Sequence, residues 1–256
     1  MSFTVENLEF YLLVLMRISA FVMAAPFFNY NAIPTRMKAA ISFMLTLVVI
    51  QTLPVISLSY TGVLGFAVLV LKETVVGLIL GFLCNVCFYI INFAGQIMDM
   101  EMGLAMASIY DPSTNVQITV TGNMYNYFVM LLLVVTNTHY YIIRAIIDSF
   151  SYFNVGQAVF GNGIEGIIMD FLGNYFLIAI RICLPIFCCM MLINVILAVL
   201  TRAAPQMNMF VVGIQIKVMA GLIVLIFMIQ TLPTVSDFIF TEMKEIVSQA
   251  IRAFSP

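Results

Sequence analysis

The sequence contains little charge. Only 9% of its 256 residues are charged and 63% are hydrophobic, whereas a soluble domain has roughly 25% charged residues. Such a chain has too little polar surface to stay dispersed in water, which indicates an integral membrane protein. The net charge is only -2 and no basic run is present, so we expect no nucleic-acid partner.

The motifs of common enzymes are also missing. The sequence has no H-E-x-x-H, no G-x-S-x-G, no P-loop and no dinucleotide-binding fingerprint. Its single histidine, His139, follows a short polar stretch at an expected helix end, which favours an interfacial position over catalysis. We therefore expect no enzymatic activity and no cofactor.

The five cysteines do not form a disulfide or zinc framework. Cys84 and Cys87 make one C-x-x-C, and the others are Cys183, Cys188 and Cys189. All lie in apolar runs, without a second C-x-x-C or a histidine nearby in sequence, so they are interpreted as small apolar side chains between helices. The N-terminus lacks the positively charged region of a secretory signal, so we expect the first helix to be retained.

Long apolar runs are abundant, and about 20 such residues suffice to span a membrane. The runs are Leu8–Phe28, Ala39–Leu53, Val63–Met98, Met124–Ile143, Phe171–Leu200 and Phe210–Leu232. They predict an all-α, polytopic membrane-type protein of about six long helices in hairpins, with a mixed connector over 144–170. The third run is too long for one perpendicular span. Its Gly77 and Gly81 form a G-x-x-x-G pair, which lets another helix approach closely.

The C-terminal segment Asp237–Phe254 has a different pattern. Its apolar residues recur at helical spacing: Ile239, Met243, Ile246, Val247, Ala250, Ile251 and Phe254. Charged residues occupy positions between them. This pattern predicts an amphipathic helix that lies on a membrane surface or against a partner.

Five charged residues lie inside apolar runs: Arg17, Lys72, Glu73, Arg181 and Lys217. At the centre of a lipid-facing helix each costs about 2.5–3.5 kcal/mol, so we expect them to face a bundle interior, a lumen or another subunit. Lys72 and Glu73 cannot pair because neighbouring helical residues point about 100° apart. Arg17 or Arg181 is a possible partner for Glu73, and both are expected in intrabundle or intersubunit pairs. Lys72 and Lys217 fit an interfacial position equally well.

Part of the sequence occurs twice. Residues 24–57 and 203–236 share 11 identities over 34 positions, and every pair is 179 residues apart. The identities include an Ala-Ala-Pro start, an asparagine, a lysine and an Ile-Gln-Thr-Leu-Pro end. Identical residues of such different types all keep the same sequence offset, which indicates an internal repeat. The second and sixth helices are therefore interpreted as related hairpin arms.

One long polar interruption, Met98–Gly122, separates the apolar halves of the chain. It contains several methionines and glycines and an Asp-Pro turn signal. Its acidic residues Asp99, Glu101 and Asp111 could gather a cation, but a solvated or lumen-facing loop explains them better. We therefore expect no metal, and we expect the helices to hold this loop in place.

Motifs spread over the whole chain form a further pattern. Pro26, Pro34, Arg36 and Lys38 follow the first run, Lys72-Glu73 precedes Gly77 and Gly81, and Ala94-Gly95 precedes the interruption, which contains Gly103-Leu104, Ala107 and Asp111-Pro112. The most specific piece is Asn194, then an R-x-A-P-Q-x-x-x-F motif of Arg202, Ala204, Pro205, Gln206 and Phe210, then Gly213 and Lys217. With these motifs the chain resembles the FliR/SctT family of type III secretion export-gate proteins.

The resemblance implies a non-catalytic subunit of the flagellar export gate, in the bacterial plasma (inner) membrane at the flagellar basal body. One copy would assemble with several FliP-like and FliQ-like subunits into a helical pore complex, and an FlhB-like subunit would wrap around it. Unfolded flagellar proteins would pass through the pore. The fold would be a FliP-like part followed by a FliQ-like hairpin.

The resemblance also implies that the central loop plugs the pore. The plug residues would be Met102, Gly103, Leu104, Met106, Ala107, Asp111, Pro112 and Gly122. Methionine suits a compliant seal, because its unbranched side chain repacks easily around a passing chain.

We therefore expect a single export-gate subunit over residues 1–256. Its parts are N-terminal helices over 1–98, a plug loop over 99–123, a fourth helix and connector over 124–170, a C-terminal helical hairpin over 171–236 and an amphipathic tail over 237–256. The alternative is a stand-alone secondary transporter built on the repeat, with Arg181 or Lys217 binding an anionic substrate. An intramembrane hydrolase is disfavoured, because the sequence offers no nucleophile–base constellation.

Overall fold

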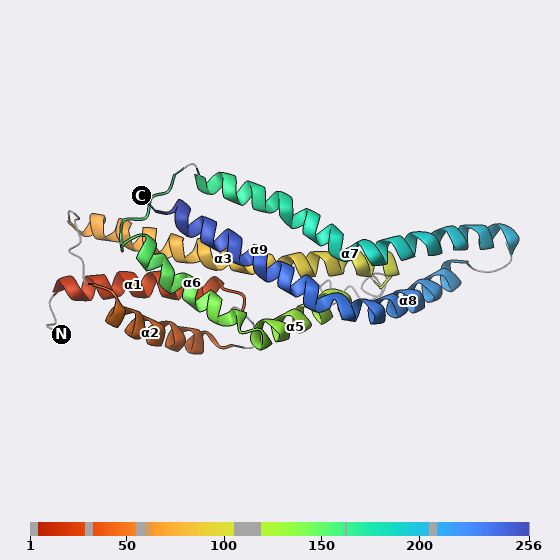
Figure 1. Ribbon diagram of the computed structural model, residues 1–256, viewed down its shortest axis with the longest axis horizontal. Coiled ribbons are helices and arrows are strands. Elements are labelled where there is room, and N and C mark those ends of the chain that lie inside the picture. Colours follow the sequence, from red (N-terminus) through yellow and green to blue (C-terminus); the bar gives the residue numbers. More distant parts are fainter. Residues whose placement is uncertain are drawn as a thin grey trace. The chain divides into compact units, whose positions relative to one another are not determined.

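The computed structural model describes residues 5–28, 33–54, 60, 62–104, 119–161, 163–204 and 209–255. Their regular structure is helical throughout (Figure 1), which confirms the predicted all-α class. The helices are α1 (Val5–Ala24), α2 (Thr35–Thr52), α3 (Gly62–Met102), α5 (Val120–Val135), α6 (Thr138–Tyr152), α7 (Gly163–Ala203), α8 (Met209–Met228), the short η1 (Ile229–Thr231) and α9 (Leu232–Ala253).

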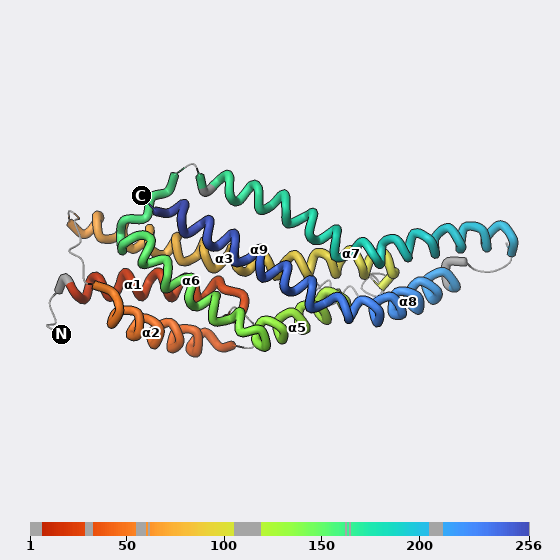
Figure 2. The backbone as a smooth tube through the Cα atoms, viewed as in Figure 1, coloured from red at the N-terminus to blue at the C-terminus, as the bar shows by residue number. Residues whose placement is uncertain are grey.

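The chain forms two compact units. The first unit is Met1–Cys87, Thr136–Phe171 and Phe240–Pro256, and the second unit is Phe88–Val135 and Leu172–Ile239. The chain enters each unit more than once, as can be followed by colour in Figure 2. The division expected from the sequence, with its plug loop over 99–123, stays a prediction.

In the first unit, α1 is the central helix. It packs beside α2 (Figure 1) and also against the first half of α3. A methyl group on Gly77 would overlap the main-chain oxygen of Arg17, and one on Gly81 would come within 2.8 Å of the Phe21 oxygen. The helix that approaches the G-x-x-x-G pair is therefore α1 of the same chain.

In the second unit, glycines again mark close contacts. A methyl group on Gly95 of α3 would collide with the Gly122 main chain of α5, and one on Gly221 of α8 would collide with the Met102 side chain. Met98 and Met102 are almost completely buried. The end of α3 is thus held in a methionine-containing core.

Length and apolar composition qualify four stretches as candidate spans: Asn7–Ala24, Gly62–Met102, Glu165–Ala203 and Val212–Ala253. A fifth arises only if α5 and α6 count as one broken span. Within the described part of the chain, the predicted second helix is present as α2 with 18 residues, but it is not apolar enough to count among these candidate spans. Its first turn carries Arg36 and Lys38, which lower the mean hydropathy of its 18 residues.

Three helix boundaries differ from the sequence prediction. The run Met124–Ile143 is broken at Asn137, which has a left-handed φ of 58°, a conformation that asparagine tolerates better than most residues. The connector over 144–170 is largely helical, since α6 continues to Tyr152 and α7 begins at Gly163. α3 continues past Met98 to Met102, where Gly103 with φ 80° ends it.

The amphipathic pattern of the C-terminal segment is confirmed. All seven of its predicted apolar residues are buried in the protein itself, which argues against placement on a membrane surface. The last turn packs in the first unit, where the Phe254 ring contacts the rings of Phe153 and Phe160. The Val159 main-chain N–H also donates to the Phe254 oxygen at 3.1 Å. Pro233 lies in the first turn of α9, where its missing N–H costs little.

Candidate functional site

The most polar feature of the protein interior is an ion pair in the first unit. Arg17 of α1 and Glu73 of α3 are both fully buried. The guanidinium donates to both carboxylate oxygens, at 2.5 Å from Nε and 3.1 Å from Nη2. Its Nη1 donates to the Ser149 hydroxyl oxygen at 3.2 Å. Such a bidentate pair is the strongest geometry available to these two groups.

Aromatic rings and a tight turn complete this network. The guanidinium carbon lies 4.1 Å from the ring centre of Phe150 and 4.4 Å from that of Phe153, in cation–π contact. Gly156, with a left-handed φ of 83°, donates its main-chain N–H to Glu73 at 2.7 Å. Groups from α1, α3, α6 and the following turn therefore enclose the pair. Because both side chains are fully buried, we interpret the pair as a structural centre.

The other charges in apolar helices have different surroundings. Lys72 and Lys217 are half-buried, and Arg181 is exposed on α7. Within the described part of the chain, ion pairs join Arg17 to Glu73 and Arg144 to Asp148, and none involves Lys72, Arg181 or Lys217. Glu73 thus lies against Arg17 and not Arg181.

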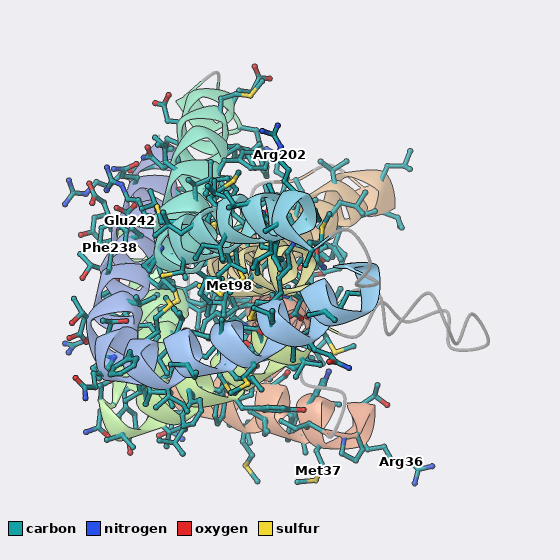
Figure 3. All side chains as sticks on the ribbon, turned by 90° about the vertical axis from the view of Figure 1, so that its right-hand side faces the viewer. Arg36, Met37, Met98, Arg202, Phe238 and Glu242 are labelled. Atoms are coloured by element: carbon teal, nitrogen blue, oxygen red, sulfur yellow. The ribbon has the colours of Figure 1, made fainter. Side chains whose placement is uncertain are left out.

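The polar interruption begins and ends in ordered helices. Asp99, only 4% exposed, accepts the Thr121 main-chain N–H at 3.2 Å on both carboxylate oxygens, and the Thr121 hydroxyl also donates to it. Thus Asp99 of α3 caps the first turn of α5, whose N–H groups lack partners within their own helix. Figure 3 shows Met98, one residue earlier, among the inner side chains. Sequence reasoning missed this contact, since nothing in the pattern indicates which donor Asp99 meets.

The expected plug residues fall into three groups. Met102 and Gly122 lie in α3 and α5 and are buried. Gly103 and Leu104 follow α3 and are half-buried. Met106, Ala107, Asp111 and Pro112 lie outside the described residues.

The titratable side chains were also compared with the requirements of a metal site. Over the described ranges, no three His, Cys, Asp or Glu residues are placed to hold a metal ion. His139 is half-buried, and its ring lies beside those of Phe27 and Tyr140. It therefore has the surroundings of a packed aromatic side chain.

The late R-x-A-P-Q motif surrounds the connection between α7 and α8. Asn194 is half-buried on α7, Arg202 is exposed in its last turn, and Ala204 follows it. Gly213 of α8 packs against α7, because a methyl group there would contact Leu197 at 3.5 Å. Phe210 lies in the first turn of α8, and Pro205 and Gln206 lie outside the described residues.

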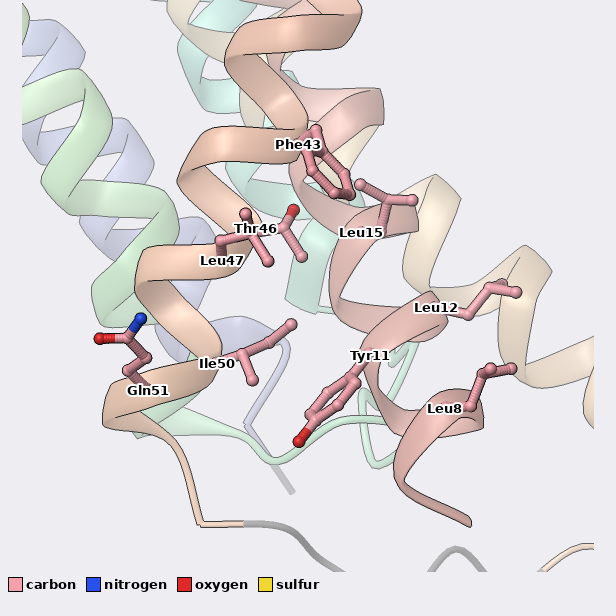
Figure 4. Close-up of a pocket in the computed structure, with 9 residues that line it drawn as sticks. All are labelled: Leu8, Tyr11, Leu12, Leu15, Phe43, Thr46, Leu47, Ile50 and Gln51. Atoms are coloured by element: carbon pink, nitrogen blue, oxygen red, sulfur yellow. The ribbon is translucent and has the colours of Figure 1, made fainter. Parts of the chain in front are cut away.

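An apolar groove of about 560 Å³ runs between α1 and α2 (Figure 4). Its walls are Leu8, Tyr11, Leu12 and Leu15 from α1, and Phe43, Thr46, Leu47, Ile50 and Gln51 from α2. Each wall follows helical spacing, a pattern from which the sequence could have indicated a seam. The lining is apolar apart from Tyr11, Thr46 and Gln51. Arg36 and Met37 point outward elsewhere on α2 (Figure 3).

Comparison with known proteins gives one consistent result. A family model described as "Bacterial export proteins, family 1" matches residues 8–243. The flagellar biosynthetic protein FliR of Bacillus subtilis is 28% identical over 232 residues, which cover 88% of each chain. FliR of Pectobacterium carotovorum is 28% identical over 239 residues (93% of this chain, 91% of that one), and FliR of Escherichia coli is 24% identical over 246 residues (95% and 93%).

Proposed function

The chain belongs to family 1 of the bacterial export proteins, and from this premise we propose that it is a non-catalytic subunit of the flagellar type III secretion export gate. The family and the apolar helices support a membrane protein with a role in flagellar export. We propose further that one copy assembles with FliP-like and FliQ-like subunits in the plasma membrane, next to an FlhB-like subunit. The observation that carries this proposal is the family match along nearly the whole chain.

The surface of the second unit supports assembly with other membrane subunits. Only 22% of the most apolar part of α7 is buried, against 61% for α3. Large apolar side chains remain exposed on α7 and α8, among them Leu177, Leu184, Met191, Leu222, Ile226 and Phe227. Such extensive apolar surface fits contact with lipid or with partner helices. The exposed charge on α7, Arg181, fits a partner better than lipid.

The way in which the ends of the segment between α3 and α5 are held supports a role as a plug. Asp99 binds Thr121, and Gly95 packs against Gly122, so the segment begins and ends at one place in the second unit. A segment that is anchored at both ends can fill a pore and stays next to the pore when it is displaced. We propose that it plugs the pore and that unfolded flagellar proteins displace it.

Deletion of residues 105–118, bridged by a short Gly-Ser linker, tests the plug. The deletion spares Asp99 and Thr121, so we expect co-purification with FliP-like and FliQ-like subunits to be unchanged. Reconstituted complexes should then conduct ions, because the pore has lost its seal. The matched control replaces the same residues by a Gly-Ser stretch of equal length. Conductance equal to that of empty membranes in the deletion variant would show that this segment is not a plug.

The internal repeat favours a second candidate, a stand-alone secondary transporter. The two copies begin alike, because a helix ends at Ala24 in one and at Ala203 in the other. They end differently, since α2 stops at Thr52 whereas the second copy continues through η1 directly into α9. In that case Arg181 or Lys217 would bind an anionic substrate. Purification decides between the two, since a transporter is stable and monodisperse alone whereas a gate subunit needs co-expressed partners.

A further inference from the structure

Arg181 occupies an unusual position on the surface of α7. It is exposed, and two of its neighbours at helical spacing, Leu177 and Leu184, are apolar side chains that are 54% and 48% exposed. Along the chain the nearest charged residues are Asp170 and Arg202. A single cation therefore lies inside a long apolar face.

Neither water nor lipid suits this face. In water, the exposed leucine and isoleucine side chains forgo about 25 cal/mol of hydrophobic free energy for every Å² of apolar surface left uncovered. In hydrocarbon, the guanidinium costs about 2.5–3.5 kcal/mol. A surface that is apolar and also presents a carboxylate satisfies both requirements, because it covers the apolar groups and pairs with the arginine.

The position of Arg181 also argues against an anchor in the lipid headgroups. Such an arginine stands where a helix passes from apolar to polar residues. Here exposed large apolar side chains lie on both sides along α7, with Phe176 and Leu177 before Arg181 and Leu184 and Phe187 after it. The arginine thus interrupts an apolar face and does not mark its edge.

Among the residues that the structure describes, no carboxylate forms an ion pair with Arg181. Among the described residues, the ion pairs are Arg17–Glu73 and Arg144–Asp148. Arg17 shows what an arginine in an apolar helix of this protein requires, namely a bidentate carboxylate at full burial. Arg181 has the same chemical requirement but faces outward.

We propose that the face of α7 around Arg181 binds an apolar helix of another membrane subunit that carries an Asp or Glu side chain opposite Arg181. This inference rests on the proposed function, since it needs a hetero-oligomer, and it adds the chemistry by which one partner helix is recognised. The carboxylate fixes the register of the two helices, and the apolar side chains around it bury the contact.

The first test is charge reversal in the assembled complex. The full chain is co-produced with the FliP-like and FliQ-like proteins of the same bacterium, as wild type and as Arg181→Glu, Arg181→Lys and Arg144→Glu variants. We expect Arg181→Glu to lower the co-purified partner at least tenfold, because two carboxylates would meet. Arg181→Lys should retain most of the partner, and Arg144→Glu, on an exposed part of α6, should have no effect.

The second test identifies the partner helix without disturbing the charge. A photo-crosslinking amino acid replaces Leu184, with the fully buried Ile186 as the matched control position. We expect the Leu184 crosslink to join a partner peptide with an Asp or Glu within one helical turn. Changing that residue to Lys should restore assembly of the Arg181→Glu variant.

Three results would overturn the inference. Normal assembly of Arg181→Glu, with loss of bound anionic phospholipid in native mass spectrometry, would assign Arg181 to lipid headgroups. Crosslinks from Leu184 only to this chain would assign Arg181 to an ion pair within the protein. The same loss of assembly in an Asp111→Asn variant would give the same assignment. A partner peptide without an acidic residue would exclude the carboxylate. If the wild-type chain itself recovers no partner subunit, the proposed function fails, whatever the variants do.

Discussion

Replacing Arg17 by Met should destabilise the first unit strongly. The substitution leaves the Glu73 carboxylate fully buried, and among the described residues the Gly156 N–H is its remaining hydrogen-bond donor. Removing one partner of a buried ion pair costs about 3–5 kcal/mol, and the lost cation–π contacts with Phe150 and Phe153 act in the same direction. We expect a loss of about 3–5 kcal/mol in the free energy of unfolding. Equilibrium unfolding in mixed micelles, followed by circular dichroism, measures it.

The double variant Arg17→Met/Glu73→Met is the decisive comparison. It removes both charges and leaves the Gly156 N–H unpaired, at a cost of about 1–3 kcal/mol. The Ser149 hydroxyl keeps the Ile146 oxygen as its acceptor at 2.7 Å. The double variant should therefore be more stable than Arg17→Met alone. Two results would refute the account of Arg17 and Glu73 as a tightly coupled pair. One is that the losses in free energy of unfolding of the two single variants add up in the double variant, and the other is a loss below about 1 kcal/mol for Arg17→Met alone.

Four further substitutions test the packing and the helix cap. Gly77→Ala should lower the free energy of unfolding by about 1–3 kcal/mol, since its methyl group overlaps the α1 backbone. Gly173→Ala, in open space on α7, should gain up to about 1 kcal/mol, and equal effects at both sites would contradict the close approach. Phe254→Ala should cost about 3–5 kcal/mol, because its fully buried ring anchors the end of α9, and a loss below 1 kcal/mol would exclude that anchor. Asp99→Ala should cost about 0.5–2 kcal/mol and speed hydrogen exchange at Thr121, whereas unchanged exchange would exclude the cap.

The sequence predicted features that depend on local pattern. The helical class follows from long apolar runs, and the amphipathic character of the C-terminal helix follows from its helical spacing, although the sequence placed that helix on a membrane surface or against a partner and not inside this protein. The sequence alone also distinguishes the charged residues that lie inside apolar runs from ordinary surface charges. These residues are Arg17, Lys72, Glu73, Arg181 and Lys217. All of these depend on residues a few positions apart, where helical geometry fixes which side chains share a face.

Features that depend on tertiary contacts were beyond sequence reasoning. Two arginines were equally possible partners for Glu73, and only packing brings Arg17 to it, together with Ser149 at a separation of 132 residues. The break at Asn137 was missed because the apolar pattern continues through it, while one left-handed residue ends the helix. The cap that Asp99 provides for α5 has no sequence signature, since it joins residues of different helices.

Arg17 also limits the order in which the protein can enter a membrane. Glu73 is synthesised 56 residues after Arg17, and at about 5–20 residues per second the ribosome needs roughly 3–11 seconds to reach it. During that time α1 in hydrocarbon carries an uncompensated arginine, at about 2.5–3.5 kcal/mol. The nascent α1 should therefore wait at the insertion machinery until α3 emerges. The two helices then enter together, as a pair of opposite charge.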